Sequence, residues 1–191
     1  FNRGIDHRPT FIRNSDYRRA FDTLNYYQYK DPLIRLSYLF KATKERKTAI
    51  LDDLGRHQKL VSFLSYCLMP NHFHFLIKQE CDCGISKFMS NFQNSFTKYF
   101  NTRQQRNGPL FLNQFKAVRI ETEEQFLHVS RYIHLNPYSS FVIKTLEELI
   151  NYPWSSFREY AGNTEVGACD KTFLMSFFKN RLYCCTDETE F

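Results

Sequence analysis

The sequence predicts one α+β domain in which an antiparallel sheet is covered by helices. Three observations carry this prediction. Hydrophobic residues make up 42% of the 191 residues, which is enough for a core. Two short apolar runs flank a turn signal, and longer segments repeat apolar residues at helical spacing. The expected order is helix, strand, strand, helix, strand, helix.

Helices are expected in several segments, each for a local reason. Residues 15–30 open with Ser15 as a cap and repeat apolar side chains every three or four positions, until Pro32. Residues 33–57 indicate one or two further helices, and residues 85–103 form an amphipathic aromatic stripe. Residues 123–137 predict a helix that stops near Asn136, because Pro137 disfavours a helical residue before it. Another short helix is expected near 145–150.

Strands are expected at three places. Residues 60–69 are apolar, Pro70-Asn71 is a turn signal, and residues 72–78 indicate the returning strand. Residues 111–122 are predicted to form a third strand after a basic loop at 103–110.

The chain is basic, with a formal net charge of +6 and a pI near 9.0. Such a charge favours an anionic partner, nucleic acid first and a membrane surface second. Aromatic residues reach 17%; most should fill the core, and a minority is expected to stack on bases. No apolar run is long enough for a membrane span. The first residue is Phe1 and no signal-peptide pattern follows, which is compatible with a start inside a longer gene product.

The cysteines are predicted to be free thiols in a reducing, cytoplasmic setting. They form no CxxC pair and make a poor disulfide framework. They are Cys67, Cys81, Cys83, Cys169, Cys184 and Cys185.

Two histidines stand two positions apart in the stretch NHFHFLI. On a strand, His72 and His74 project from one face while Phe73 packs on the other, which suits two imidazoles that hold one divalent ion. The commoner reading of such a pair is a hydrogen-bonded or half-exposed one. A zinc site completed by Cys81 and Cys83 is the weaker alternative, since a straight strand would put Cys81 about 23 Å from His74.

A second group of polar residues lies on the helix predicted for 123–137. His128, Tyr132 and Asn136 recur every four residues and share one stripe, offset from the core-facing stripe of Phe126, Val129 and Ile133. Tyr132 could simply pack at a helix edge, which is the commoner case. Alternatively, two histidines and an amide oxygen hold a cation that activates a phosphodiester, and Tyr132 attacks the phosphorus to give a covalent phosphotyrosine.

The stretch CLMPNHFHFLI at 67–77 resembles the motif of HUH single-tyrosine transposases, in particular the REP-associated tyrosine transposases. YIHLNP at 132–137 is similar to that family's second signature, and Tyr132 follows His74 by 58 positions. FNRG at the start, GPLF and FKA within 108–117, and YPWSS at 152–156 extend the resemblance from residue 1 to about residue 162.

This resemblance implies a ferredoxin-like sheet and assigns roles to four residues. His72, His74 and Asn136 would bind Mg²⁺ or Mn²⁺, and Tyr132 would be the nucleophile. The substrate would be single-stranded DNA with a hairpin, cut to a 5′-phosphotyrosine and a free 3′-OH. The domain would span 1–162, with a possible helical insertion at 31–59 and a C-terminal extension at 163–191. The protein would work in the bacterial cytoplasm near the nucleoid, as a monomer or homodimer.

Basic side chains around the predicted loop are candidates for DNA contacts, with Tyr99 and Phe111 as nearby stacking aromatics. An ordinary solvated basic surface is an equally good explanation for any one of them. The candidates are Arg3, Lys98, Arg103, Arg106, Lys116 and Arg119. Beside a metal-dependent transposase or endonuclease, two other functions stay open: a non-catalytic nucleic-acid-binding module of the same fold, and a zinc-dependent hydrolase.

Overall fold

A three-stranded antiparallel sheet forms the middle layer of the protein. The computed structural model describes residues 1–162 and 167–177. Strand β2 (Val61–Met69) and strand β3 (His72–Gln79) form a hairpin, and the short strand β1 (Asn2–Arg3) pairs with the other side of β3. The strand order is β1-β3-β2, so β3 is central.

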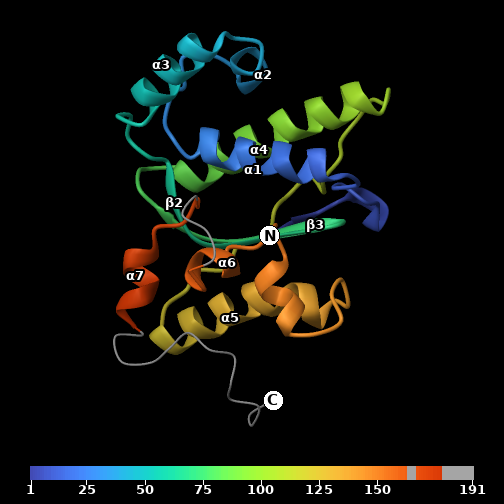
Figure 1. Cartoon of the computed structure of the whole chain (residues 1–191), viewed down its shortest axis with the longest axis vertical. Coiled ribbons are helices and arrows are strands. Elements are labelled where there is room, and N and C mark those ends of the chain that lie inside the picture. Colours follow the sequence, from blue (N-terminus) through green and yellow to red (C-terminus); the bar gives the residue numbers. More distant parts are fainter. Residues whose placement is uncertain (163–166, 178–191) are drawn as a thin grey trace.

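Helices cover both faces of this sheet (Figure 1). Helices α1 (Asn14–Tyr27) and α4 (Gly84–Arg103) lie on one face, and α5 (Glu123–Ser139) lies on the other. The predicted α+β fold, an antiparallel sheet between helices, is therefore confirmed. The remaining elements are α2 (Leu36–Leu39), α3 (Lys44–Leu54), α6 (Phe157–Tyr160), α7 (Lys171–Ser176) and the 3₁₀ helices η1 (Ile5–His7) and η2 (Glu147–Asn151).

The two-residue period of β3 separates its side chains by chemistry. Phe73 and Phe75 point toward α4, where they meet a stack of α4 phenylalanines that includes Phe88 and Phe92. The alternate residues face α5, and Leu76 joins the apolar cluster on that side. The histidines therefore share the α5 face, as their spacing predicts.

Strand β2 contributes to both cores because its side chains alternate, and a register irregularity changes which residues face each core. The pairing with β3 shifts between Phe63 and Ser65, so two β2 residues stand opposite one on β3. Before this bulge Phe63 faces the α1/α4 core, and after it Cys67 and Met69 face α5. All nine residues of β2 are buried.

The edge of β2 is covered by the YPWSS segment, residues 152–156. The Tyr152 hydroxyl donates to the Leu68 carbonyl at 2.7 Å, and the Leu68 N–H donates to the Trp154 carbonyl at 2.9 Å. The Ser156 N–H donates to the Tyr66 carbonyl at 2.9 Å. Backbone N–H and C=O groups on the outer edge of β2 thereby find hydrogen-bond partners within the chain.

Residues 31–57 form a closed excursion that contains α2 and α3. Lys30 N–H donates to the Gln58 carbonyl at 2.8 Å, and Tyr29 and Lys59 form an antiparallel bridge, so the excursion starts and ends at one place. Its apolar side chains, Leu36, Leu39, Ile50 and Leu54, pack on Tyr26 of α1 in a small separate cluster. One or two helices were expected here, and two are present.

Three predicted details are wrong. Ser15 does not cap α1: the helix begins at Asn14, and the Asp16 carboxylate accepts the N–H groups of Ile12 and Arg13 at 3.0 Å. Residues 111–122 do not form a strand; only Phe111 makes a bridge, to Gly4, and the side chains from 113 to 119 are mostly exposed. Phe111 is buried, but the side chains after it do not alternate between buried and exposed as those of a half-buried strand do.

The third correction concerns the end of α5. The helix does not stop near Asn136 but continues to Ser139 with Pro137 inside it. The proline has no N–H to donate to the Ile133 carbonyl, so the helix continues through it with one hydrogen bond fewer. The Asn136 carbonyl accepts the Ser140 N–H at 3.0 Å, and the Pro137 carbonyl accepts the Val142 and Ile143 N–H groups at 2.9 and 3.1 Å.

Cys67, Cys81, Cys83 and Cys169 are free thiols, as expected, and Cys184 and Cys185 lie outside the described residues. Within 1–162 and 167–177, no helix combines the length and the apolar character needed to cross a membrane.

Candidate active site

The α5 face of the sheet brings the two predicted histidines together. The ring centroids of His72 and His74 are 5.1 Å apart and the rings are nearly perpendicular. Burial lowers the pKa of His72. The pKa of His74 is lowered to about 3, first by burial and then by His72 and the N-terminal amino group. Both imidazoles are thus held neutral, which is the form that offers a lone pair to a cation.

Asn136 of α5 faces His72 across the gap between helix and sheet. Its side-chain oxygen Oδ1 lies 3.3 Å from His72 Nε2, and the residue is only 3% exposed. Strand β3 and helix α5 are far apart in sequence, so this meeting is a product of the fold. The third residue of the predicted ligand set is therefore beside the first.

Asn71 fixes the orientation of the His72 ring. Its Nδ2 donates to the His7 carbonyl at 3.3 Å, which turns its Oδ1 toward His72 Nδ1 at 2.7 Å. Nδ1 then carries the proton, and Nε2 carries a lone pair. In this orientation of the Asn136 amide, two acceptors face each other, an arrangement that a bound cation satisfies.

Tyr132 lies one helical turn before Asn136 on α5 and is 49% exposed. Its ring meets the edge of His74, with centroids 5.3 Å apart and an interplanar angle of 89°. The phenol therefore stands at the open side of the histidine pair, where a large substrate can reach it. His128, one turn earlier, is exposed.

Phe1 covers the face of the His74 ring. Its ring stacks on the imidazole with centroids 5.0 Å apart and an angle of 14°. The Phe1 carbonyl accepts the Lys116 N–H at 2.8 Å, and the Phe1 nitrogen donates back to the Lys116 carbonyl at 2.8 Å. Residues 110–116 are held beside β1 in this way and reach the site.

The zinc alternative with Cys81 and Cys83 is not formed. Across residues 1–162 and 167–177, no three side chains of His, Cys, Asp or Glu gather into a metal-binding group. The oxygen nearest to the histidine pair in the predicted ligand set belongs to Asn136, an amide and not one of those four types.

The basic candidates divide between two places. Arg3 pairs with His72 across the β1–β3 ladder, and its charge contributes to the lowered pKa of that histidine. Lys116 is next to Phe1, and Arg119 is exposed, 3.9 Å from Glu121. Lys98 and Arg106 lie on the far side of the sheet, on α4 and the loop after it.

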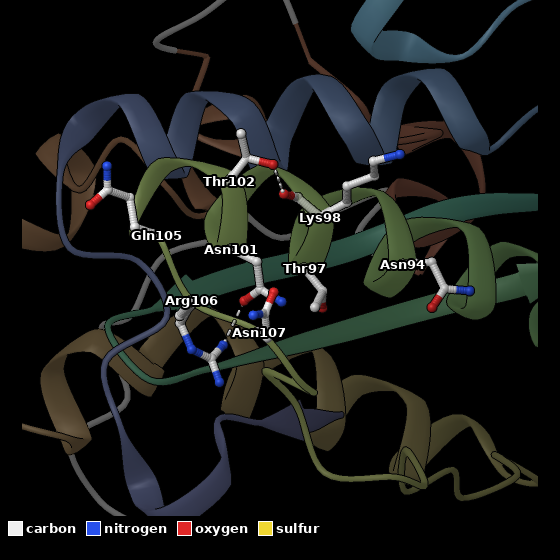
Figure 2. Close-up of a pocket in the computed structure, with 8 residues that line it drawn as sticks. All are labelled: Asn94, Thr97, Lys98, Asn101, Thr102, Gln105, Arg106 and Asn107. Carbon is white, nitrogen blue, oxygen red and sulfur yellow. Dashed lines mark hydrogen bonds between the residues drawn. The ribbon is translucent and has the colours of Figure 1, made fainter.

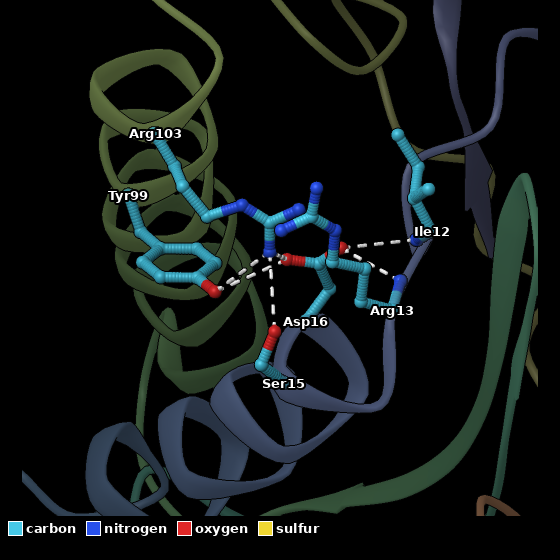
Figure 3. A network of polar contacts seen from close by, with 6 residues as sticks. All are labelled: Ile12, Arg13, Ser15, Asp16, Tyr99 and Arg103. Carbon is cyan, nitrogen blue, oxygen red and sulfur yellow. Dashed lines mark hydrogen bonds and ion pairs between the residues drawn. The ribbon is translucent and has the colours of Figure 1, made fainter.

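Arg103 is occupied by contacts inside the protein (Figure 3). Its guanidinium forms an ion pair with the buried carboxylate of Asp16 and donates to the Ser15 hydroxyl at 3.2 Å. The Tyr99 hydroxyl donates to the same carboxylate at 3.1 Å. Helix α4 is therefore tied to the start of α1 by these side chains.

The predicted role of Phe111 as a stacking aromatic is wrong. The residue is 4% exposed and packs on Phe73 in the core. Tyr99 is half-buried against Asp16. An aromatic residue beside a basic loop does not reveal which way its ring points.

Two contributors to the site were not predicted: Asn71, which was assigned only to a turn, and Phe1. A signal for Asn71 exists in the sequence, because an amide directly before a strand histidine can reach that histidine's Nδ1. Phe1 carried no such signal, since its contact depends on the pairing of β1 with β3.

The site thus consists of paired histidines on an antiparallel sheet, opposed by a helix that presents an exposed tyrosine and a buried amide. The chain belongs to the family of IS200-like transposases, whose model matches residues 32–136 and so includes β3 and most of α5. Among solved structures, it is similar to that of the REP-associated tyrosine transposase bound to a REP hairpin. The identity is 12%, the TM-score is 0.50, and the match covers 88% of this chain and 87% of the other. No curated protein matches.

Proposed function

We propose that this transposase-family protein cleaves and rejoins single-stranded DNA through a 5′-phosphotyrosine formed on Tyr132. One observation carries the proposal: a half-exposed tyrosine stands perpendicular to one of two adjacent neutral histidines, and an amide oxygen lies beside the other. A serine or threonine hydroxyl at this place would be shorter, whereas the phenol reaches outward from α5 toward a bulky phosphodiester.

The residues fit a divalent cation such as Mg²⁺ or Mn²⁺. His72 Nε2, a ring nitrogen of His74 and Asn136 Oδ1 would hold it. When bound, such an ion polarises the phosphodiester and stabilises charge that develops on it. Asn71 holds the His72 lone pair in place, and Arg3, one strand away, adds positive charge near the phosphate.

The proposed reaction exchanges one phosphodiester for another. The Tyr132 oxygen bonds to phosphorus, the bond from phosphorus to the 3′ oxygen breaks, and the phenolic proton leaves as the 3′-OH forms. A second 3′-OH can reverse the step elsewhere, so that no energy source is required. Hairpin-containing DNA is the proposed substrate, because the fold is shared with a transposase that was solved bound to a REP hairpin.

The first prediction tests the nucleophile. Tyr132→Phe removes only one oxygen from an exposed position, so the fold and DNA binding should persist while covalent adduct is lost, by at least roughly 10³-fold. The measurement is a denaturing gel of protein incubated with end-labelled hairpin DNA and Mn²⁺. Tyr138→Phe, an exposed tyrosine of the same helix, is the matched control.

Adduct formed by the Tyr132→Phe protein would refute the assignment of the nucleophile. If the unmodified chain binds hairpin DNA but forms no adduct with any divalent metal, the alternative holds: a nucleic-acid-binding module that keeps the fold without the chemistry.

A further inference from the structure

A polar groove lies on the opposite side of the sheet from Tyr132. It has a volume of about 530 Å³ and is lined by the C-terminal half of α4 and the loop that follows it. Figure 2 shows its side chains. Those that matter here are Asn94, Lys98, Asn101, Gln105, Arg106 and Asn107.

The groove contains two cations, several amides and no acid. Arg106 is held in place, since Nη1 donates to Asn101 Oδ1 at 2.7 Å and Nη2 to the Pro109 carbonyl at 2.9 Å. Asn101 in turn donates to the Gly108 carbonyl at 2.8 Å. Lys98 is exposed beside them. A fixed guanidinium next to an exposed ammonium and amide donors is suited to phosphate oxygens.

The groove belongs to a long segment without negative charge. Residues 84–120 contain no Asp or Glu, but six Lys or Arg and nine Asn or Gln. Amide side chains can hydrogen-bond to both phosphates and base edges of nucleic acid. A surface that binds an acidic protein would need only Lys and Arg side chains. The composition therefore favours nucleic acid.

This segment also connects the groove to the histidine site. After the groove, Leu110 accepts the Ile5 N–H at 3.0 Å, Leu112 donates to the Arg3 carbonyl at 3.0 Å, and Lys116 pairs with Phe1. Residues 110–116 thus pass along β1, the edge of the sheet, from the α4 side to the ring that stacks on His74. A DNA backbone that follows this path meets positive charge from Lys98 to Arg3.

We propose that this groove is a second DNA-binding site, which takes the phosphodiester backbone of the same DNA whose cleaved strand reaches Tyr132. The site rests on the proposed function for its ligand, but its contacts are separate from the reacting groups. Paired stem and unpaired flank share this backbone chemistry, and the experiment distinguishes them.

The experiment measures binding by fluorescence anisotropy in the Tyr132→Phe background, so that covalent chemistry plays no part. The double variant Asn94→Asp, Gln105→Glu turns two exposed amides into carboxylates of nearly the same size. Its matched control, Gln58→Glu with Asn151→Asp, makes the same charge change at exposed amides elsewhere. Probes are a blunt duplex, an unstructured poly-dT strand and a hairpin with a single-stranded tail.

We expect the groove variant to raise Kd for the tailed hairpin about tenfold or more relative to the control. Lys98→Gln alone should flatten the dependence of log Kd on log salt by about 0.7 to 0.9, the share of one phosphate. If the groove variant also binds the blunt duplex more weakly, the groove contacts the paired stem. If it also binds poly-dT more weakly, the groove contacts the unpaired flank. Equal Kd values for the groove and control variants on all probes would overturn the proposal.

The outcome is independent of the proposed reaction. A chain that forms no adduct but shows the groove effect would support the groove as a DNA-binding site and refute Tyr132 as the nucleophile. A chain that forms the adduct but shows no groove effect would support Tyr132 and refute the groove.

Discussion

At the scale of single residues, Asn71 contributes to the site without standing in the proposed ligand set. Its amide bridges the His7 carbonyl and His72 Nδ1, so it sets which imidazole nitrogen has a lone pair. We predict that Asn71→Ala weakens Mn²⁺ binding by roughly tenfold to a hundredfold. Isothermal titration of the DNA-free protein measures this, with Asn151→Ala at an exposed site as the control. Unchanged Mn²⁺ affinity would show that His72 is oriented by other contacts.

Arg103 and Arg119 differ in what their charge does. Removal of Arg103 leaves the buried Asp16 carboxylate with only neutral donors, whereas Arg119 is exposed. We predict that Arg103→Ala lowers the free energy of unfolding by about 2–3 kcal/mol, and Arg119→Ala by less than about 0.5 kcal/mol. Urea denaturation measures both. Equal, small losses would release Arg103 for the DNA contacts predicted for it.

At the scale of elements, the position of α5 decides whether Tyr132 and Asn136 meet the histidines. His134, on the same helix, contacts the Ser156 hydroxyl at 2.7 Å, and Ser156 Oγ also accepts the Tyr66 N–H at 2.9 Å. Ser156 is part of the segment that covers the β2 edge, so one hydroxyl joins α5 to the sheet. Both sides of the proposed site are thereby fixed to β2 and β3.

We predict that Ser156→Ala lowers the free energy of unfolding by about 1–3 kcal/mol, because a buried strand N–H loses its acceptor. Ser140→Ala, at an exposed position just beyond α5, should change it by less than about 0.5 kcal/mol. Thermal and urea denaturation test the pair. A stable Ser156→Ala protein would mean that backbone pairing alone holds the 152–156 segment.

The helices and the β2–β3 hairpin were predictable because their patterns are local. Alternation in HFHFLI and the turn at Pro70 lie within a few residues of one another. The failures depended on distant partners. Residues 111–122 run beside β1, which is only two residues long, and Phe111 turns inward to meet Phe73. The pairing of His72 with Asn136 was expected from the family resemblance, since no periodicity connects β3 to α5.

At the scale of the whole molecule, the α2–α3 excursion is separate from the site. Its ends meet at the Tyr29–Lys59 bridge, and its apolar residues pack on the outer side of α1. We predict that replacement of residues 31–57 by an Asn-Gly turn leaves a folded protein that still forms the Tyr132 adduct, at reduced thermal stability. Adduct assays and circular dichroism test this. A folded chain that forms no adduct would place part of the excursion in substrate binding. The predicted domain boundary at residue 162 is a separate matter and stays a prediction.

The alternation of β3 has a consequence for how the protein reaches its native state. If β3 slipped by one residue against β2, the imidazoles would enter the phenylalanine core and Phe73 would face α5. Two buried imidazoles without partners would make such a register unstable. The register that buries the phenylalanines is therefore the same register that places both histidines on the α5 side. A chain that has formed its hydrophobic core has already brought both rings to the side where Tyr132 stands.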